Sequence, residues 1–276
     1  MKIRILVGTA SALLVAGVVL AGDLAIMAAV SLVAVMAVLE YCKAMETAGY
    51  KPVRLLCVLG GALLWPAGWL LETGRTGIGG VLAGACLLWL ISAVWAMIRF
   101  NQLSIADLAV TWLGLLYIPG GLLFLSLLLT LAQGRSWMIL LLAGTIATDT
   151  LAYFTGVLVG KHHVLRLISP KKTLEGVIGG AAGGFLVVIL VGGLLQRSDI
   201  LEGSTGLWMG LGALIGTTAQ LGDWMASWFK RKAGVKDFGA LLPGHGGILD
   251  RCDSFLLSAP AVFFYIFFLT GGGRIS

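Results

Sequence analysis

The stretch AVTWLGLLYIPGGLLFLSLLLTL, residues 109–131, is almost entirely apolar and contains no charged side chain. About 20 helical residues cross a hydrocarbon layer of roughly 30 Å, so this stretch predicts a membrane-spanning helix. The rest of the chain has the same character, since 59% of its 276 residues are hydrophobic and only 12% are charged, with a mean hydropathy of +0.99. This composition excludes an ordinary soluble globular domain and predicts an all-α polytopic membrane protein.

Charged breaks divide the chain into nine predicted membrane spans. The N-terminal run lacks the pattern of a cleaved signal peptide, so we expect it to remain as the first span. The spans cover residues 5–21, 24–41, 54–71, 77–98, 109–131, 136–158, 176–195, 205–226 and 254–270.

Lys and Arg residues are distributed unevenly between the two sides that nine spans define. One side carries 15 of the 19 Lys and Arg residues, together with all three His. Basic loops tend to remain in the cytoplasm. We therefore place the N-terminus and the polar loops 159–175 and 227–253 on the cytoplasmic side.

Glycines recur at four-residue spacing in the two spans that precede the last one. Small residues let membrane helices approach closely, so this spacing predicts a helix-packing seam. The glycines concerned are Gly176, Gly180 and Gly184 in one span, and Gly206 with Gly210 and Gly212 with Gly216 in the next.

Asp149 lies near the middle of the span 136–158. A charged side chain at that depth costs roughly 2.5–3.5 kcal/mol, so an intramembrane Asp indicates a functional site. Two alternatives remain open, namely a protonated Asp that is hydrogen-bonded to a neighbouring helix and a proton relay in a transporter.

The loop 159–175 ends in Ser169, Lys171, Lys172 and Thr173, directly before the span 176–195. A helix N-terminus presents unpaired amide groups and a positive dipole, and two lysines reinforce its attraction for phosphate. The alternatives are that the lysines serve only as topology signals or headgroup contacts, and that Thr173 is only an N-cap.

The most highly charged stretch is SWFKRKAGVKDFGALLPGHGGILDRCD, residues 227–253. Its cations Lys230, Arg231, Lys232 and Lys236 can bind phosphates, and its glycines near His245 allow close approach to a ligand. Together these features indicate an enzyme that uses a nucleotide at the membrane surface.

Asp250 and Asp253 share one face if they are helical, and Asp223 is predicted to reach a similar depth. Hard cations such as Mg²⁺ prefer carboxylate oxygens and leave room for substrate phosphate. The carboxylates could instead favour the N-terminal dipole of the last helix and pair with Arg251.

The C-terminal half of the chain resembles the phosphatidate cytidylyltransferases, also called CDP-diacylglycerol synthases. The segments DTLAYFTG from Asp149 and SPKKTLEG from Ser169 contribute to the resemblance, which covers roughly residues 145–255. A 27-residue signature is matched throughout, with Cys252 as a mild departure where a larger apolar residue is usual. Its matched positions are Ser227, Phe229, Lys230, Arg231, Lys236, Asp237, Gly239, Leu242, Pro243, His245, Gly246, Gly247, Ile248, Asp250, Arg251 and Asp253.

The resemblance implies transfer of CMP from CTP to phosphatidic acid with Mg²⁺ as cofactor, and the acid count leaves room for a second cation. It also implies a catalytic transmembrane region over residues 136–276, preceded by an N-terminal transmembrane region over 1–135. The expected metal ligands are Asp223 and Asp250, with Asp253 and Asp149 as further candidates. The expected catalytic residues are Asp223, Asp250, Lys172, Lys236 and His245. The expected substrate-binding residues are Ser169, Lys171, Lys172, Thr173, Lys230, Arg231, Lys236, Asp237, His245, Gly246, Gly247 and Arg251.

The expected partners are CTP, phosphatidic acid and membrane lipid, in the inner membrane of a bacterium, with a homodimer consistent with the glycine seams. Nucleic acid is not expected, because no soluble basic domain exists to present the net charge of +6. A transporter and a lipid kinase such as a polyprenol kinase are the alternatives. A transporter explains the charged loops poorly, since its decisive polar groups lie near the membrane midplane.

Overall fold

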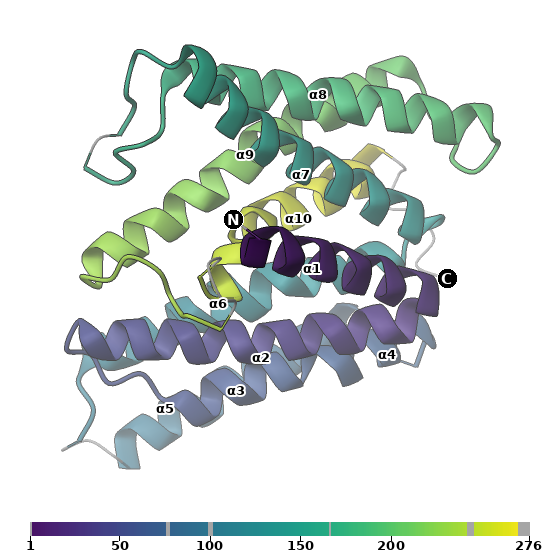
Figure 1. The fold of residues 1–276 in the computed structure, drawn as a ribbon. Helices are drawn as coiled ribbons and strands as arrows, with labels where there is room; N and C mark the ends of the chain where they lie inside the picture. The colour runs from purple at the N-terminus through teal and green to yellow at the C-terminus, as the bar shows by residue number, and fades with distance from the viewer. Residues whose placement is uncertain (1, 76–77, 99–101, 166, 242–245, 270–276) are drawn as a thin grey trace. The chain divides into compact units, whose positions relative to one another are not determined.

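The computed structural model describes residues 2–75, 78–98, 102–165, 167–241 and 246–269, which form ten α-helices and no named strand (Figure 1). The expectation of an all-α fold is therefore confirmed. The helices are α1 (Lys2–Ala21), α2 (Asp23–Thr47), α3 (Arg54–Ala62), α4 (Leu64–Glu72), α5 (Ile78–Ile98), α6 (Ile105–Leu129), α7 (Gly134–Val159), α8 (Leu174–Arg197), α9 (Thr205–Lys232) and α10 (Leu249–Leu269).

In the part of the chain that the structure describes, the predicted spans fall on helices, with 54–71 divided between α3 and α4. Within the described residues, six segments are long and apolar enough to cross a membrane: α2, the α3–α4 segment Arg54–Leu71, α6, α7, α8 and α10. The other three predicted spans fall on α1, α5 and α9. Of these, α9 is 28 residues long but carries Gln220 and Asp223 among its apolar residues. The protein is thus polytopic, with six candidate spans in the described part of the chain.

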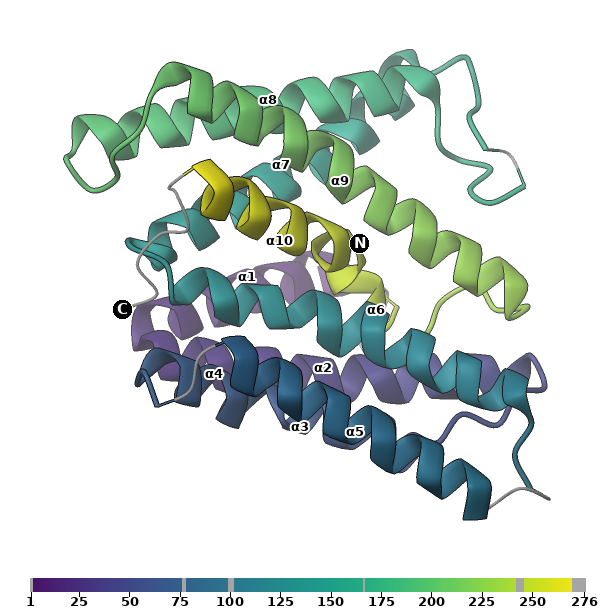
Figure 2. The same ribbon diagram turned by 180° about the vertical axis from the view of Figure 1, so that it is seen from behind.

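The chain divides into two compact units, which are described separately. The first contains the described residues of 1–130 and 232–252, and the second those of 131–231 and 253–274. In the first unit, α2 packs against α3, α4 and α6, and two views show α2, α3 and α6 running alongside one another (Figure 2). The buried Tyr41 hydroxyl donates to the Val110 carbonyl at 3.0 Å, which joins α2 to α6.

In the second unit, α7 and α8 pack along the predicted glycine seam. Gly176, Gly180 and Gly184 face α7, where a Cβ on Gly180 would lie 2.8 Å from the Thr148 carbonyl. The seam continues to α9, since a Cβ on Gly216 would lie 2.8 Å from the Ala181 carbonyl of α8. The seam is confirmed at these positions and at Gly212, which packs against Phe185, and Gly210 packs against Tyr265 of α10.

Gly206 differs from the other predicted seam positions. The nearest atom to a Cβ placed there is the Ser204 hydroxyl oxygen, 3.9 Å away and in the residues just before α9. This glycine lies in the first turn of α9, and its four-residue spacing to Gly210 does not extend the seam.

Gly184→Val is expected to lower the melting temperature of the detergent-solubilised protein. The new Cβ would collide with the Thr148 hydroxyl and the Gly144 carbonyl oxygen, and such overpacking costs about 1–3 kcal/mol. Gly193→Val is the matched control, because a Cβ at that position of the same helix meets nothing within 4 Å. Equal melting temperatures for the two variants would contradict close packing at Gly184.

Candidate active site

The loop between α7 and α8 is held by hydrogen bonds that define the start of α8. The Thr173 side chain accepts from the Gly176 amide at 3.2 Å, so Thr173 is the N-cap that the sequence left open as an alternative. Glu175 in the first turn accepts from the backbone amides of Lys161 and His162 at 3.0 and 3.2 Å and contacts His162 Nδ1 at 2.6 Å. The backbone also pairs between His163 and Thr173. These contacts fix the chain that leads into the helix.

Lys172 is the residue that joins this loop to α9. Its Nζ forms an ion pair with Asp223 and lies 5.6 Å from the ring centroid of Trp224. The pair is partly shielded, since the side chains of Lys172 and Asp223 are 25% and 30% exposed. Ser227, one turn further along α9, donates to Asp223 Oδ1 at 3.5 Å. The neighbouring Lys171 is exposed, so the structure distinguishes two lysines that look equivalent in the sequence.

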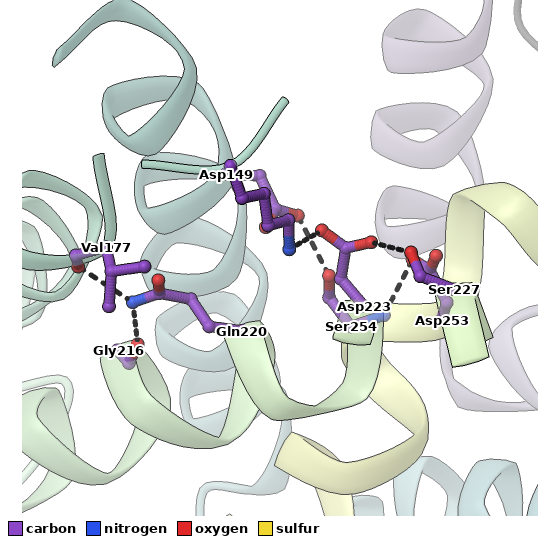
Figure 3. Close-up of polar contacts among 9 residues, drawn as sticks. Asp149, Val177, Gly216, Gln220, Asp223, Ser227, Asp253 and Ser254 are labelled. Atoms are coloured by element: carbon purple, nitrogen blue, oxygen red, sulfur yellow. Dashed lines mark hydrogen bonds and ion pairs between the residues drawn. The ribbon is translucent and has the colours of Figure 1, made fainter. Parts of the chain in front are cut away.

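Two further acids lie near Asp223, as Figure 3 shows. Asp149 of α7 accepts from the Ser254 hydroxyl at 3.0 Å, and Asp253 accepts from the Ser254 backbone amide at 2.9 Å. Asp149 is exposed within its unit, whereas Asp253 is only 8% exposed. Gly222 permits this arrangement, because a Cβ there would lie 2.5 Å from the Asp253 carbonyl oxygen. The second unit therefore gathers Asp149, Asp223 and Asp253 from three helices.

Gln220 anchors the same part of α9 to α8. Its side-chain amide donates to the Val177 carbonyl at 3.1 Å and to the Gly216 carbonyl at 2.8 Å (Figure 3). Gln220 and the glycine seam thus fix how α9 lies against α8. That packing determines where Asp223 meets Lys172.

The acids of this cluster interact with one another and with cations. Asp253 lies within electrostatic range of Asp223 and Asp149, and also of the buried Lys230. Acids placed this close repel one another unless a positive charge lies nearby. Lys172 and Lys230 supply such charge in the protein itself.

These carboxylates are ligands of the type that Mg²⁺ prefers, although they do not form a complete coordination sphere. In the part of the chain that the structure describes, no group of three His, Cys, Asp or Glu side chains is placed to hold a metal. Mg²⁺ commonly takes only one or two protein carboxylates and completes its shell with water and substrate phosphate. The residues present therefore fit a metal that binds together with a nucleotide.

Asp250 lies in the first unit and has its own set of contacts. It is 9% exposed, in the first turn of α10, and its Oδ2 accepts from the amides of Phe238 and Gly247, each at 2.9 Å. A carboxylate in the first turn also matches the expected dipole alternative. Gly246 adopts φ +85°, a left-handed conformation that glycine tolerates. The convergence of Asp250 and Asp223 on one ion stays a prediction.

The remaining predicted site residues differ in their surroundings. Arg231 Nε donates to the Ile168 carbonyl at 3.1 Å, which ties α9 to the α7–α8 loop. The Ser169 carbonyl accepts from the Lys172 amide at 3.2 Å. His245 lies outside the described residues. Four of these residues are exposed: Arg231, Lys236, Asp237 and Arg251.

Five residues with the contacts described here were not predicted from the sequence: Glu40, Glu175, Gln220, Trp224 and Ser254. Glu40 lies inside the predicted span 24–41 but close to its end, so its charge is a weaker signal than that of Asp149. Glu175 follows the N-cap Thr173 by two residues in the first turn of α8, where acids are favoured. The sequence offers no such signal for Gln220, Trp224 or Ser254.

Comparison with known proteins gives a consistent family for the whole chain. Residues 2–269 match the cytidylyltransferase family. A phosphatidate cytidylyltransferase of Mycobacterium bovis is 32% identical over 250 residues, which covers 85% of this chain and 78% of that protein. A protein of the same name from Staphylococcus aureus is 37% identical over 168 residues, covering 60% of this chain and 62% of that protein. These matches confirm the expected resemblance, and the chain belongs to the cytidylyltransferase family.

Proposed function

We propose that this chain is a phosphatidate cytidylyltransferase, which transfers CMP from CTP to phosphatidate and releases pyrophosphate. Its similarity to proteins of that name over most of its length carries this conclusion. It favours the enzyme over the transporter and lipid kinase alternatives. The cluster of acids and cations in the second unit supplies the groups that a reaction between phosphates needs.

The proposed reaction is an in-line displacement at phosphorus. A phosphate oxygen of phosphatidate forms a bond to the α-phosphorus of CTP, and the bond from that phosphorus to the bridging oxygen of the β-phosphate breaks. The electron pair leaves with pyrophosphate. Because the attacking phosphate is already an anion at neutral pH, no side chain has to remove a proton from it. The protein therefore contributes positioning and charge stabilisation, as in other phosphoryl transfers.

The proposed ligands of Mg²⁺ are Asp223 and Asp250, with Asp253 and Asp149 as further candidates and room for a second cation. When bound, the metal would neutralise charge on the reacting phosphate oxygens. Lys172 already contacts Asp223, so its ammonium lies beside the proposed metal ligand and is available to a phosphate. Ser227 and Ser254 orient the carboxylates of Asp223 and Asp149 by hydrogen bonds.

The other cations are proposed to hold the substrates. The buried Lys230 beside Asp253 and the half-buried Lys172 suit phosphates close to the reaction, whereas the exposed Lys171 suits the phosphatidate headgroup. The remaining proposed substrate contacts are Ser169, Thr173, Arg231, Lys236, Asp237, His245, Gly246, Gly247 and Arg251.

The uneven distribution of Lys and Arg supports nine spans with a cytoplasmic N-terminus and a polar cavity that opens toward the cytoplasm. The bacterial relatives support a location in the inner membrane. A homodimer remains part of the proposal, and nucleic acid is not a proposed partner.

The function is tested by incubating purified protein with labelled CTP and short-chain phosphatidate in detergent, with and without Mg²⁺. We expect Mg²⁺-dependent formation of CDP-diacylglycerol, with little product when ATP replaces CTP and none from Asp250→Asn. Failure of folded wild type to form product would overturn the proposed reaction. Near-normal Mg²⁺-dependent activity of Asp250→Asn would exclude Asp250 as a metal ligand but would not contradict the proposed reaction.

A further inference from the structure

Glu40 contacts the segment that precedes α10 with both of its carboxylate oxygens. It lies in α2, seven residues before that helix ends at Thr47. Its Oε1 accepts from the Ile248 amide at 3.0 Å, and its Oε2 accepts from the Leu249 amide at 2.9 Å. Amides at the start of a helix have no acceptor within it, and a carboxylate is favoured at this positive end of α10.

Two glycines let the loop backbone approach this carboxylate. A Cβ on either Gly239 or Gly247 would collide with the Glu40 carboxylate oxygens. The two glycines lie at separate points of the stretch between α9 and α10, so Glu40 contacts two parts of that stretch. Neither position has room for a larger residue while Glu40 keeps this position.

Asp250 accepts hydrogen bonds from the same two parts of that stretch. Its Oδ2 accepts from Phe238, next to Gly239, and from Gly247, next to Ile248. Glu40 and Asp250 together therefore accept four backbone amides from two short runs, Phe238–Gly239 and Gly247–Leu249. The orientation of the Asp250 carboxylate depends on amides whose immediate neighbours are held by Glu40.

We infer that Glu40 is a positioning residue that sets the orientation of the Asp250 carboxylate. The inference rests on the proposed function, in which Asp250 is a metal ligand. Carboxylates that ligate metals depend on hydrogen bonds from their surroundings, and the loss of such support typically costs 10–100-fold in metal affinity or activity. Oδ2 accepts both hydrogen bonds from the loop to Asp250. These hydrogen bonds therefore set the direction in which the carboxylate faces a metal ion.

Glu40→Gln tests the inference with almost no change in size. The substitution replaces one acceptor oxygen with the amide NH₂ group of Gln, which is a donor. One of the two hydrogen bonds is therefore replaced by an unfavourable contact between this NH₂ group and a backbone N–H. We expect kcat to fall about 10–100-fold and half-maximal activity to need about tenfold more Mg²⁺. We also expect faster hydrogen–deuterium exchange at the amides of Gly247, Ile248 and Leu249, measured without nucleotide or metal.

Glu46→Gln is the matched control. Glu46 lies further along the same helix and forms an exposed ion pair with Arg54, away from the contacts that hold Asp250. We expect its kcat, its Mg²⁺ requirement and the exchange of residues 247–249 to stay within about twofold of wild type, since exposed pairs contribute little. Glu40→Asp keeps both acceptors on a shorter side chain. We expect its kcat, its Mg²⁺ requirement and the exchange of residues 247–249 to lie between those of wild type and Glu40→Gln.

Several results would overturn the inference. One is a Glu40→Gln protein with wild-type kcat and Mg²⁺ requirement. Another is a lower kcat with unchanged exchange at residues 247–249. If Glu40→Gln does not fold, a Glu40→Asp protein that matches wild type in all three measurements would overturn it. Normal activity of Asp250→Asn would show separately that Asp250 is not a metal ligand. In that case the exchange measurement would still test whether Glu40 holds the loop.

Discussion

Asp223→Asn is expected to lower the rate of CDP-diacylglycerol formation about a thousandfold while the protein remains folded. Asn has the same shape and can still accept a hydrogen bond from Ser227. It loses the charge that pairs with Lys172 and that we propose for Mg²⁺ binding. A metal contributes several kcal/mol to the stabilisation of a phosphoryl-transfer transition state, and about 4 kcal/mol corresponds to a thousandfold in rate.

The control for this variant is Glu202→Gln. Glu202 is an exposed acid just before α9, at the end of that helix opposite to Lys232, so it tests the loss of one negative charge from the same unit. We expect its rate to stay within about twofold of wild type. If Asp223→Asn reached a similar rate with the Mg²⁺ requirement of wild type, Asp223 would be excluded as a metal ligand. Melting temperatures of both variants show whether folding contributes to the difference.

Hydropathy predicted the positions of the helices well, because a membrane span depends on the composition of one contiguous stretch of sequence. All nine predicted spans coincide with helices. The one break that hydropathy missed lies within the predicted span 54–71, where α3 ends at Ala62 and α4 begins at Leu64. Pro66 provides a physical reason, since it has no amide hydrogen to donate to the Ala62 carbonyl and is tolerated in the first turn of a helix. That signal is present in the sequence but does not affect hydropathy.

The glycine seam was also predictable, since four-residue spacing places small residues on one helix face. The spacing did not reveal which helix each glycine faces. Gly184 packs against Gly144 of α7, and Gly216 packs against Ala181 of α8. Gly206 has the same spacing to Gly210 but lies at the start of α9, where its nearest neighbour is Ser204. Spacing alone cannot distinguish these cases.

The pairings within the candidate site could not be predicted from the sequence. Lys172 meets Asp223 across 51 residues of chain, and Asp149 meets Ser254 across 105. Both pairings depend on how the helices pack, which a residue pattern does not specify. Asp149 was found because charge in the middle of an apolar span is costly. The other acids were predicted as oxygen ligands for a hard cation. Glu40 lies close to the end of its predicted span, and its partners are backbone amides some 208 residues away, which leave no pattern in the sequence.

Lys172→Met is expected to lower kcat about a hundredfold, and Lys171→Met is expected mainly to raise the KM for phosphatidate. Thr173 is the N-cap of α8, and Lys172 directly precedes it. The Lys172 side chain reaches Asp223 and Trp224. Loss of one positioned charge from a phosphate-binding site typically costs 10²–10³-fold in rate. Lys171 is exposed, so we expect its charge to act at the lipid surface rather than at the reacting phosphates.

The two lysine variants have the same composition and net charge, so a difference between them reports position alone. We would measure kcat and KM for CTP and for phosphatidate in mixed micelles of fixed composition. Equal losses of kcat in both variants would mean that the contact of Lys172 with Asp223 has no special role. A larger loss in Lys171→Met would place the phosphate-binding charge at residue 171. A loss confined to the kcat of Lys172→Met would support direct stabilisation of the departing pyrophosphate by the cation that contacts the proposed metal ligand.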